Sequence, residues 1–220
     1  MSASVHGTVR VDGQPVVDQT VLLLTRDDLR VVSSGTTDGD GRFEVVIPGE
    51  SRDLLALARV TTPVLDVASA ATGDDPGSGV ELAVDTSDLV AVTCRFVVEG
   101  RVPPFVSLVV EPVRLDGVPD EWLPALRRRS ADVVDAYFFM RNVDAAAPVE
   151  LLVRPGRYRF DARYVDRSRP NLIAPDFDNL VTRSVTAGPA APSGDVATDI
   201  TGPCTLVFHL RVLPDAELLG

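Results

Sequence analysis

Hydrophobic and polar residues alternate along the first 48 residues in four short runs. In the first run Val5, Val9 and Val11 fall on one face, which is the period of a half-buried β-strand. The run at 21–24 is apolar on both faces and is predicted to be covered on both sides. Because Pro15 cannot continue a central strand, residues 14–18 are expected to be connecting chain. The other strands are predicted at 20–25, 29–36 and 42–47.

The same pattern continues to residue 86 and then begins again. Strands are expected at 54–59 and 61–67, a polar loop at 69–78, a strand at 80–84 and a linker at 85–88. A second domain then opens with one long strand, whose core face is expected to carry Val90, Val92, Cys94, Phe96 and Val98.

The second domain repeats features of the first. Gly13 and Pro15, followed by an apolar run, correspond to Gly100 and Pro103, followed by the run 106–110. Pro48-Gly49 corresponds to Pro155-Gly156, and a strand follows each Pro-Gly. The spacing between the two features is about twenty residues longer in the second copy, which indicates an insertion there.

The insertion is placed around residues 112–147. Its part 120–129 is predicted to form a short helix, with Asp120 as its cap and arginines in its last turn. A dense aromatic strand is predicted at 133–143, and a long irregular loop at 166–179. Strands at 157–164, 180–185 and 205–212 complete the domain.

The first third of the chain resembles the carboxypeptidase regulatory-like family, a small transthyretin-like sandwich. The resemblance rests on Gly7, Val9, Gly13, Pro15, Val16, Val21, Leu23, Thr37, Asp38, Gly41, Phe43, Val45 and Pro48. In its turn, Asp38 is expected to accept backbone N–H bonds, Gly41 to be left-handed and Phe43 to fill the core. The Tyr158-x-Phe160-x-Ala162 run resembles the family again, as a diverged second copy.

The expected fold is therefore all-β, with two tandem Ig- or transthyretin-like β-sandwich domains. The domains are predicted at residues 1–86 and 87–220, the second with the short helical insertion around 112–147.

Charge and composition limit the classes of partner. The net charge of −11 argues against nucleic acid and anionic membranes as partners. All 21 basic residues are arginine, which excludes lysine-based mechanisms and resembles a high-GC actinobacterial coding bias. No apolar run approaches the ~20 residues of a membrane span. Since no signal peptide is recognisable either, a cytoplasmic location without membrane insertion is expected.

Few residues suggest chemistry. His6 and His209 lie on the off-core faces of terminal strands, where no metal or catalytic partner set accompanies them. The spacing of Asp38 and Asp40 resembles the start of a calcium-binding loop, but the closing glutamate of such a loop is missing. The preferred interpretation is therefore the turn of the resembled family, without a metal. We therefore expect no enzyme activity, no metal and no cofactor.

The two cysteines leave two alternatives open. Cys94 and Cys204 are expected on core-facing positions of the first and last strands of the second domain, which are often neighbours. They are either free buried thiols, the default in a cytosolic chain, or a disulfide that closes a long loop.

Two places are candidates for partner binding. Trp122, Arg127, Arg128 and Arg129 form either a docking patch or simply a helix end whose tryptophan packs on the sheet. Arg167 and Arg169 lie in the long loop at 166–179, and loops on a rigid scaffold commonly carry binding residues.

The preferred hypothesis is a non-enzymatic accessory, adaptor or structural protein that binds a protein partner through β-sandwich surfaces. The alternative is a glycan- or surface-ligand-binding module, and the third is a degenerate transthyretin-like hydrolase of the hydroxyisourate type. That third class is disfavoured because its His/Arg site and C-terminal motif are missing. Exposed sheet edges also make self-association possible.

Overall fold

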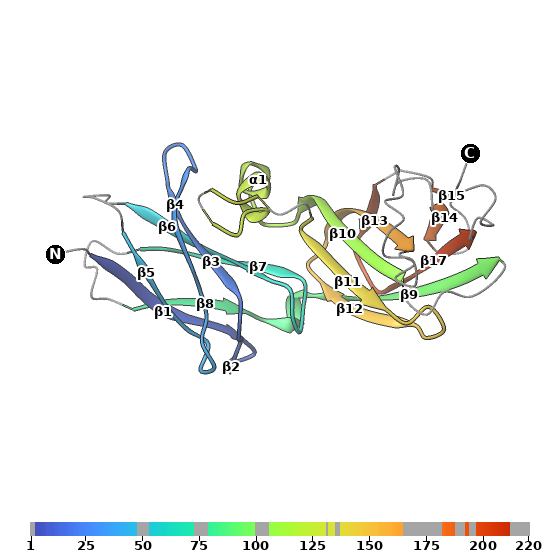
Figure 1. Ribbon diagram of the computed structural model, residues 1–220, viewed down its shortest axis with the longest axis horizontal. Helices are drawn as coiled ribbons and strands as arrows, with labels where there is room; N and C mark the ends of the chain where they lie inside the picture. Colours follow the sequence, from blue (N-terminus) through green and yellow to red (C-terminus); the bar gives the residue numbers. More distant parts are fainter. Residues whose placement is uncertain are drawn as a thin grey trace, which may run out of the picture. The chain divides into compact units, whose positions relative to one another are not determined.

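The fold is described from a computed structural model (Figure 1). It covers residues 3–47, 53–72, 79–99, 106–130, 132–134, 137–164, 182–187, 192–193 and 197–211. The chain forms two compact units. Unit 1 is Met1–Leu89, Arg114–Ala136 and Leu152–Arg154; unit 2 is Val90–Val113, Tyr137–Leu151 and Pro155–Gly220. The prediction of an all-β fold made of sandwich sheets is confirmed.

Unit 1 contains two sheets with a shared apolar core. In sheet A the strand β1 (Ser4–Val11) pairs with three others, which are β2 (Gln14–Pro15), β5 (Arg42–Val46) and β8 (Val80–Val84). Sheet B has the order β4 (Val31–Thr36), β3 (Thr20–Thr25), β6 (Leu54–Val60) and β7 (Asp66–Ala71). Val9, Phe43 and Leu82 from sheet A and Leu23 and Ala56 from sheet B join in one core cluster.

The first hairpin differs from the expectation at one point. Asp12 and Gly13 both have positive φ, 49° and 77°, as a tight two-residue hairpin turn requires. Gln14 and Pro15 then pair with β1 as a two-residue strand, where connecting chain was predicted. Pro15 is tolerated there because β2 lies at the edge of the sheet and needs no further N–H donor.

The turn at 37–43 is confirmed in each predicted detail. One carboxylate oxygen of Asp38 accepts the N–H groups of Asp40 and Arg42, each at 2.9 Å. Gly41 has a φ of +71°, and a Cβ at that position would lie 2.8 Å from the Val9 carbonyl oxygen. Phe43 is 4% exposed and lies in the core.

Replacing Asp38 with alanine is expected to lower the free energy of unfolding by about 1–2 kcal/mol, because two turn N–H groups lose a charged acceptor. The exposed Asp40 is the matched control, since its 3.7 Å contact with Arg42 is a surface ion pair and Asp40→Ala is expected to change little. Urea unfolding of both variants checks this. Equal effects would contradict the role given to Asp38.

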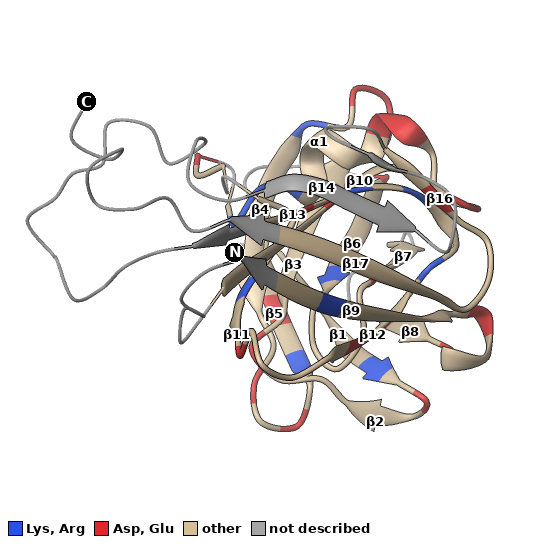
Figure 2. Cartoon of the chain, turned by 90° about the vertical axis from the view of Figure 1, so that its right-hand side faces the viewer, with Lys and Arg blue, Asp and Glu red and all other residues tan. Residues whose placement is uncertain are grey.

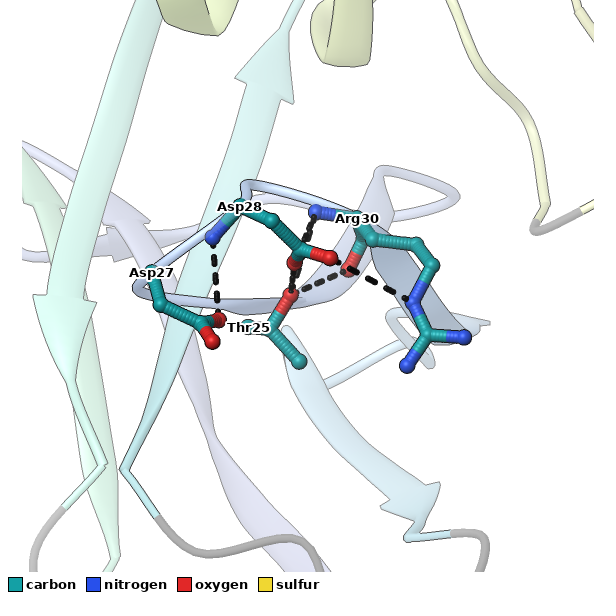
Figure 3. A network of polar contacts seen from close by, with 4 residues as sticks. All are labelled: Thr25, Asp27, Asp28 and Arg30. Atoms are coloured by element: carbon teal, nitrogen blue, oxygen red, sulfur yellow. Dashed lines mark hydrogen bonds and ion pairs between the residues drawn. The ribbon is translucent and has the colours of Figure 1, made fainter.

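The hairpin between β3 and β4 is closed by a polar network (Figure 3). The Thr25 hydroxyl donates to the Asp28 carboxylate, which also accepts the Arg30 N–H at 3.2 Å. These bonds hold the pKa of Asp28 below its ordinary value, the hydroxyl contributing most.

Acidic residues recur in loops at strand ends (Figure 2), which places much of the negative charge in turns.

Two predictions for residues 61–71 are wrong. The strand expected at 61–67 lies later, as β7, and Ser69 to Ala71 belong to it instead of to a polar loop. A cis Thr62-Pro63 bond and bends occupy the earlier residues. The expected linker at 85–88 is a 3-10 turn, η1 (Thr86–Asp88), capped by the Asp85 carboxylate on the Ser87 N–H at 2.8 Å.

Unit 2 also contains two sheets. Sheet C has the order β12 (Val149–Val153), β9 (Val90–Glu99), β17 (Cys204–Arg211), β14 (Thr182–Ala187) and β15 (Pro192–Ser193). Sheet D has the order β11 (Phe139–Val143), β10 (Val106–Leu115), β13 (Gly156–Tyr164) and β16 (Thr198–Ile200). Cys94, Leu108, Tyr158 and Phe208 are among its fully buried side chains.

Much of the strand pairing is shared by the two units. In each, the first and last strands are parallel neighbours, β1 with β8 and β9 with β17. The order β4-β3-β6-β7 in sheet B corresponds to β11-β10-β13-β16 in sheet D. The strands aligned by the two Pro-Gly motifs, β5 with β12 and β6 with β13, hold equivalent places. Unit 2 adds β14 and β15 beyond its last strand.

Candidate functional site

The outer face of sheet B is apolar and buried. Leu22 and Leu24 on β3, and Leu55 and Leu57 on β6, are 0–7% exposed, although they point away from the core shared with sheet A. The prediction that residues 21–24 are covered on both sides is therefore confirmed. Leucines on an outer sheet face need a further covering layer.

That layer comes from the predicted insertion. It contains η2 (Asp120–Trp122) and α1 (Leu123–Leu126), and α1 contacts β6 (Figure 1). Leu126 is completely buried and Ala125 is 6% exposed. The Arg59 guanidinium donates to the Leu126 carbonyl oxygen at 3.0 Å, at the end of this short helix. The contacts group residues 114–136 with unit 1 and 137–151 with unit 2, so the insertion region is divided between the units.

The helix is shorter than expected, and Pro124 lies in its first turn. It ends at Leu126, so the arginines follow it instead of lying in its last turn, and Asp120 makes no side-chain cap. Trp122 and Arg128 are half-buried, whereas Arg127 and Arg129 are exposed. The four predicted residues of this patch therefore lie within one short segment. The other two candidates, Arg167 and Arg169, lie outside the described residues.

Two exposed valines beside this patch were not identified from the sequence. Val133 and Val134 are 50% and 59% exposed, and they precede β11 instead of belonging to a strand at 133–143. The Val133 carbonyl oxygen accepts the Arg129 N–H at 3.0 Å, the Ser130 hydroxyl accepts the Val133 N–H at 3.1 Å, and Arg128 and Val134 form a β-bridge. The one feature of the sequence that could have indicated this is that Asp135 and Ala136 separate the two valines from the aromatic run that starts at Tyr137. This turn leaves both valine side chains exposed to solvent.

A buried ion pair lies elsewhere in unit 1. The Asp66 side chain is 1% exposed, and its carboxylate accepts a bidentate pair of hydrogen bonds from the Arg154 guanidinium, one of them from Nη2 at 2.9 Å. Burial raises the pKa of Asp66 above its ordinary value, although Arg154 acts in the opposite direction. The Leu65 N–H donates to the Leu152 carbonyl oxygen at 2.8 Å, and the Arg154 N–H donates to the Leu65 carbonyl oxygen at 3.2 Å.

The two cysteines are free thiols. Their strands are neighbours, as predicted, but Cys94 is aligned with Leu206 and Cys204 with Val92. An offset of two residues puts their Cα atoms roughly 8 Å apart, beyond the reach of a disulfide. Burial raises the pKa of both thiols, and it raises that of Cys94 to about 12, with smaller effects of Cys204 and Glu150. Cys204 is half-buried, so the expectation of two buried positions is wrong for it.

Because only the thiolate reacts, Ellman's reagent at pH 8 is expected to label Cys204 slowly and Cys94 only on unfolding. Cys204→Ser should therefore abolish labelling of the folded chain, whereas Cys94→Ala should leave it unchanged. Labelling that persists in Cys204→Ser would contradict the burial of Cys94.

The other sequence candidates do not converge. His6 and His209 are both exposed, and His6 is aligned with Glu44 across sheet A. Among the described residues, no group of three or more His, Cys, Asp or Glu could hold a metal ion. In the same part of the chain, no helix has the length and apolar character of a membrane-spanning one.

Comparison with known proteins leaves the family open. The sequence matches no protein-family model and no curated protein, so the resemblance to the carboxypeptidase regulatory-like family stays a prediction. Several solved structures align over almost the whole chain. They include the major pilin T-13 of Streptococcus pyogenes, with 8% identity, a TM-score of 0.32 and coverage of 96% of this chain and 97% of that one.

The shaft pilin SpaA of Lactobacillus rhamnosus GG aligns with 12% identity, a TM-score of 0.29 and coverage of 97% of this chain and 100% of that one. The Bacillus anthracis TIE protein aligns with 9% identity and a TM-score of 0.30 over 96% of this chain, which spans only 34% of that protein. These identities and TM-scores are too low for a conclusion about this chain.

Proposed function

We propose that this chain is a non-enzymatic structural or adaptor protein that binds a protein partner through the outer surface of residues 119–134. The proposal is supported by the different character of the two sides of this segment. Its inner side, Ala125 and Leu126, packs on sheet B, while Arg127, Arg129 and the two valines face solvent. A surface that combines apolar side chains with arginine, held by a rigid sandwich, is typical of protein contacts.

The proposed partner presents an apolar depression bordered by carboxylates, because such a surface complements exposed valine and arginine side chains. A cytoplasmic location is part of this proposal. The loop with Arg167 and Arg169 remains a second proposed contact.

The experiment is affinity capture of the tagged full-length chain from cells that produce it, with mass spectrometry of the bound proteins. The test variant carries Arg127→Ser, Arg129→Ser, Val133→Ser and Val134→Ser, all at exposed positions. A protein captured in stoichiometric amount by the natural chain and lost with this variant is the expected result. Capture of only the chain itself would contradict the adaptor role and favour a glycan or small ligand.

A further inference from the structure

Unit 1 is not continuous in sequence. Its main part is Met1–Leu89, and it also contains Arg114–Ala136 and Leu152–Arg154. Each of these two segments is flanked on both sides in the sequence by strands that belong largely to unit 2. The covalent route from the main part to both segments therefore runs through the single peptide bond between Leu89 and Val90. All other links between them are non-covalent.

Those non-covalent links form two specific patches. One is the apolar contact of α1 with the outer face of sheet B, together with the hydrogen bond from Arg59 to Leu126. The other is the bidentate pair of Asp66 with Arg154, next to two backbone hydrogen bonds and a parallel β-bridge between Leu65 and Val153. Leucine packing and a buried bidentate ion pair are complementary features that a second, identical segment would satisfy equally well.

The connection between Val84 and Val90 is built like a hinge. Its residues Asp85, Ser87 and Asp88 are exposed. It is tied to the sandwich by the Asp12 carboxylate, which accepts the N–H of Thr86 at 2.9 Å and its hydroxyl at 2.6 Å, and by Leu89, which is buried in the core of unit 1. Residues 85–88 can therefore extend once the Asp12 contacts and the Asp85 cap are broken, while Leu89 stays in the core of unit 1.

We propose that these contacts exchange between copies, so that residues 1–89 of one chain bind segments 114–136 and 152–154 of a second chain. The same contacts form within one chain and between two chains. The ratio of monomer to exchanged species is therefore set by the protein concentration and by the strain in the hinge. Reciprocal exchange closes a dimer, and one-way exchange extends an open chain of copies. This inference goes beyond the proposed adaptor role and does not depend on it.

Cysteine trapping in the full chain tests the exchange, in a background of Cys94→Ala and Cys204→Ser. Leu65 and Val153 are bridge partners, within the Cα distance that a disulfide spans. One copy carries Leu65→Cys and a differently tagged copy carries Val153→Cys, so neither forms this disulfide alone. The expected result after mixing and mild oxidation is a disulfide between the two tags, with a yield that rises with protein concentration.

A chain with both substitutions is the control and should form the disulfide internally at low concentration. Internal disulfide in the control without any disulfide between tags would overturn the exchange. A second measurement uses the natural cysteines and removes Ser87 and Asp88, because a shortened hinge favours exchange. Light scattering should then show dimers or larger species, whereas a folded monomer at every concentration would contradict the proposal.

Discussion

Gly7→Ala is expected to lower the free energy of unfolding of unit 1 by about 3 kcal/mol or more. Gly7 is aligned with Phe43 on β5 and with Val80 on β8, so it lies between two neighbouring strands. A Cβ at this position would lie 1.9 Å from the Val80 carbonyl oxygen and 2.8 Å from the end of the Phe43 ring. The first contact involves backbone, so β1 and β8 must move apart, and their parallel pairing weakens.

Gly39→Ala is the matched control, because a Cβ there meets no atom within 4 Å and its change should stay within about 0.5 kcal/mol. Urea unfolding followed by fluorescence measures both variants. The chain has one tryptophan, Trp122, and it belongs to unit 1, so its emission reports on that unit. Equal midpoints for the two variants would show that β1 and β8 are not packed as closely as described.

Arg154→Met is expected to destabilise unit 1 by about 3–5 kcal/mol at pH 7, because it leaves the buried Asp66 carboxylate without its cation. Asp66→Asn is expected to cost less, about 1–2 kcal/mol, since the side chain of Arg154 is 24% exposed and stays hydrated. The double variant should be more stable than Arg154→Met alone. The same fluorescence measurement gives all three values, and a cost for Arg154→Met no larger than that for Asp66→Asn would contradict this order.

The pH dependence of this effect has a definite sign. The pKa of Asp66 in the folded chain is raised above 3.8, its ordinary value. Its contribution to stability is therefore complete below about pH 3.8 and is lost as the pH rises through the folded pKa. In Arg154→Met the guanidinium is missing, so the pKa of Asp66 rises further, and the stability lost between pH 4 and 7 becomes larger. The stability difference between Arg154→Met and the natural chain should thus shrink as the pH falls from 7 towards 4, and a difference that grows on acidification would overturn the assignment.

Local chemistry made part of this fold predictable from the sequence. The turn at 37–43 is fixed by neighbours: Asp38 accepts nearby N–H groups and Gly41 takes a conformation that other residues resist. The apolar run at 21–24 indicated burial on both faces, because an exposed strand face would be polar. The two Pro-Gly motifs marked equivalent strands, since each ends one strand and starts the next.

The missing parts depend on distant partners. Leu22 and Leu57 show that the outer face of sheet B is covered, but no local pattern says that residues 114–136 cover it. Asp66 and Arg154 are 88 positions apart, and neither has a sequence neighbourhood that singles it out. The exposure of Val133 and Val134 follows from the turn that holds them, whereas their β-branched side chains favoured a strand.

The most direct test of the proposed function is a titration of the captured partner, by calorimetry, with three forms of the full chain. The first is the natural chain, and the second is the variant with serine at Arg127, Arg129, Val133 and Val134. The third is a control with Arg42→Ser and Val46→Ser, which changes an exposed arginine and an exposed valine on β5.

Unchanged unfolding midpoints must accompany the comparison, so that a loss of binding reports on the surface and not on folding. The account predicts that the four-serine variant binds at least tenfold more weakly, or about 1.4 kcal/mol, while the control binds like the natural chain. Equal affinity of all three forms would contradict it, and so would a loss confined to the control on β5.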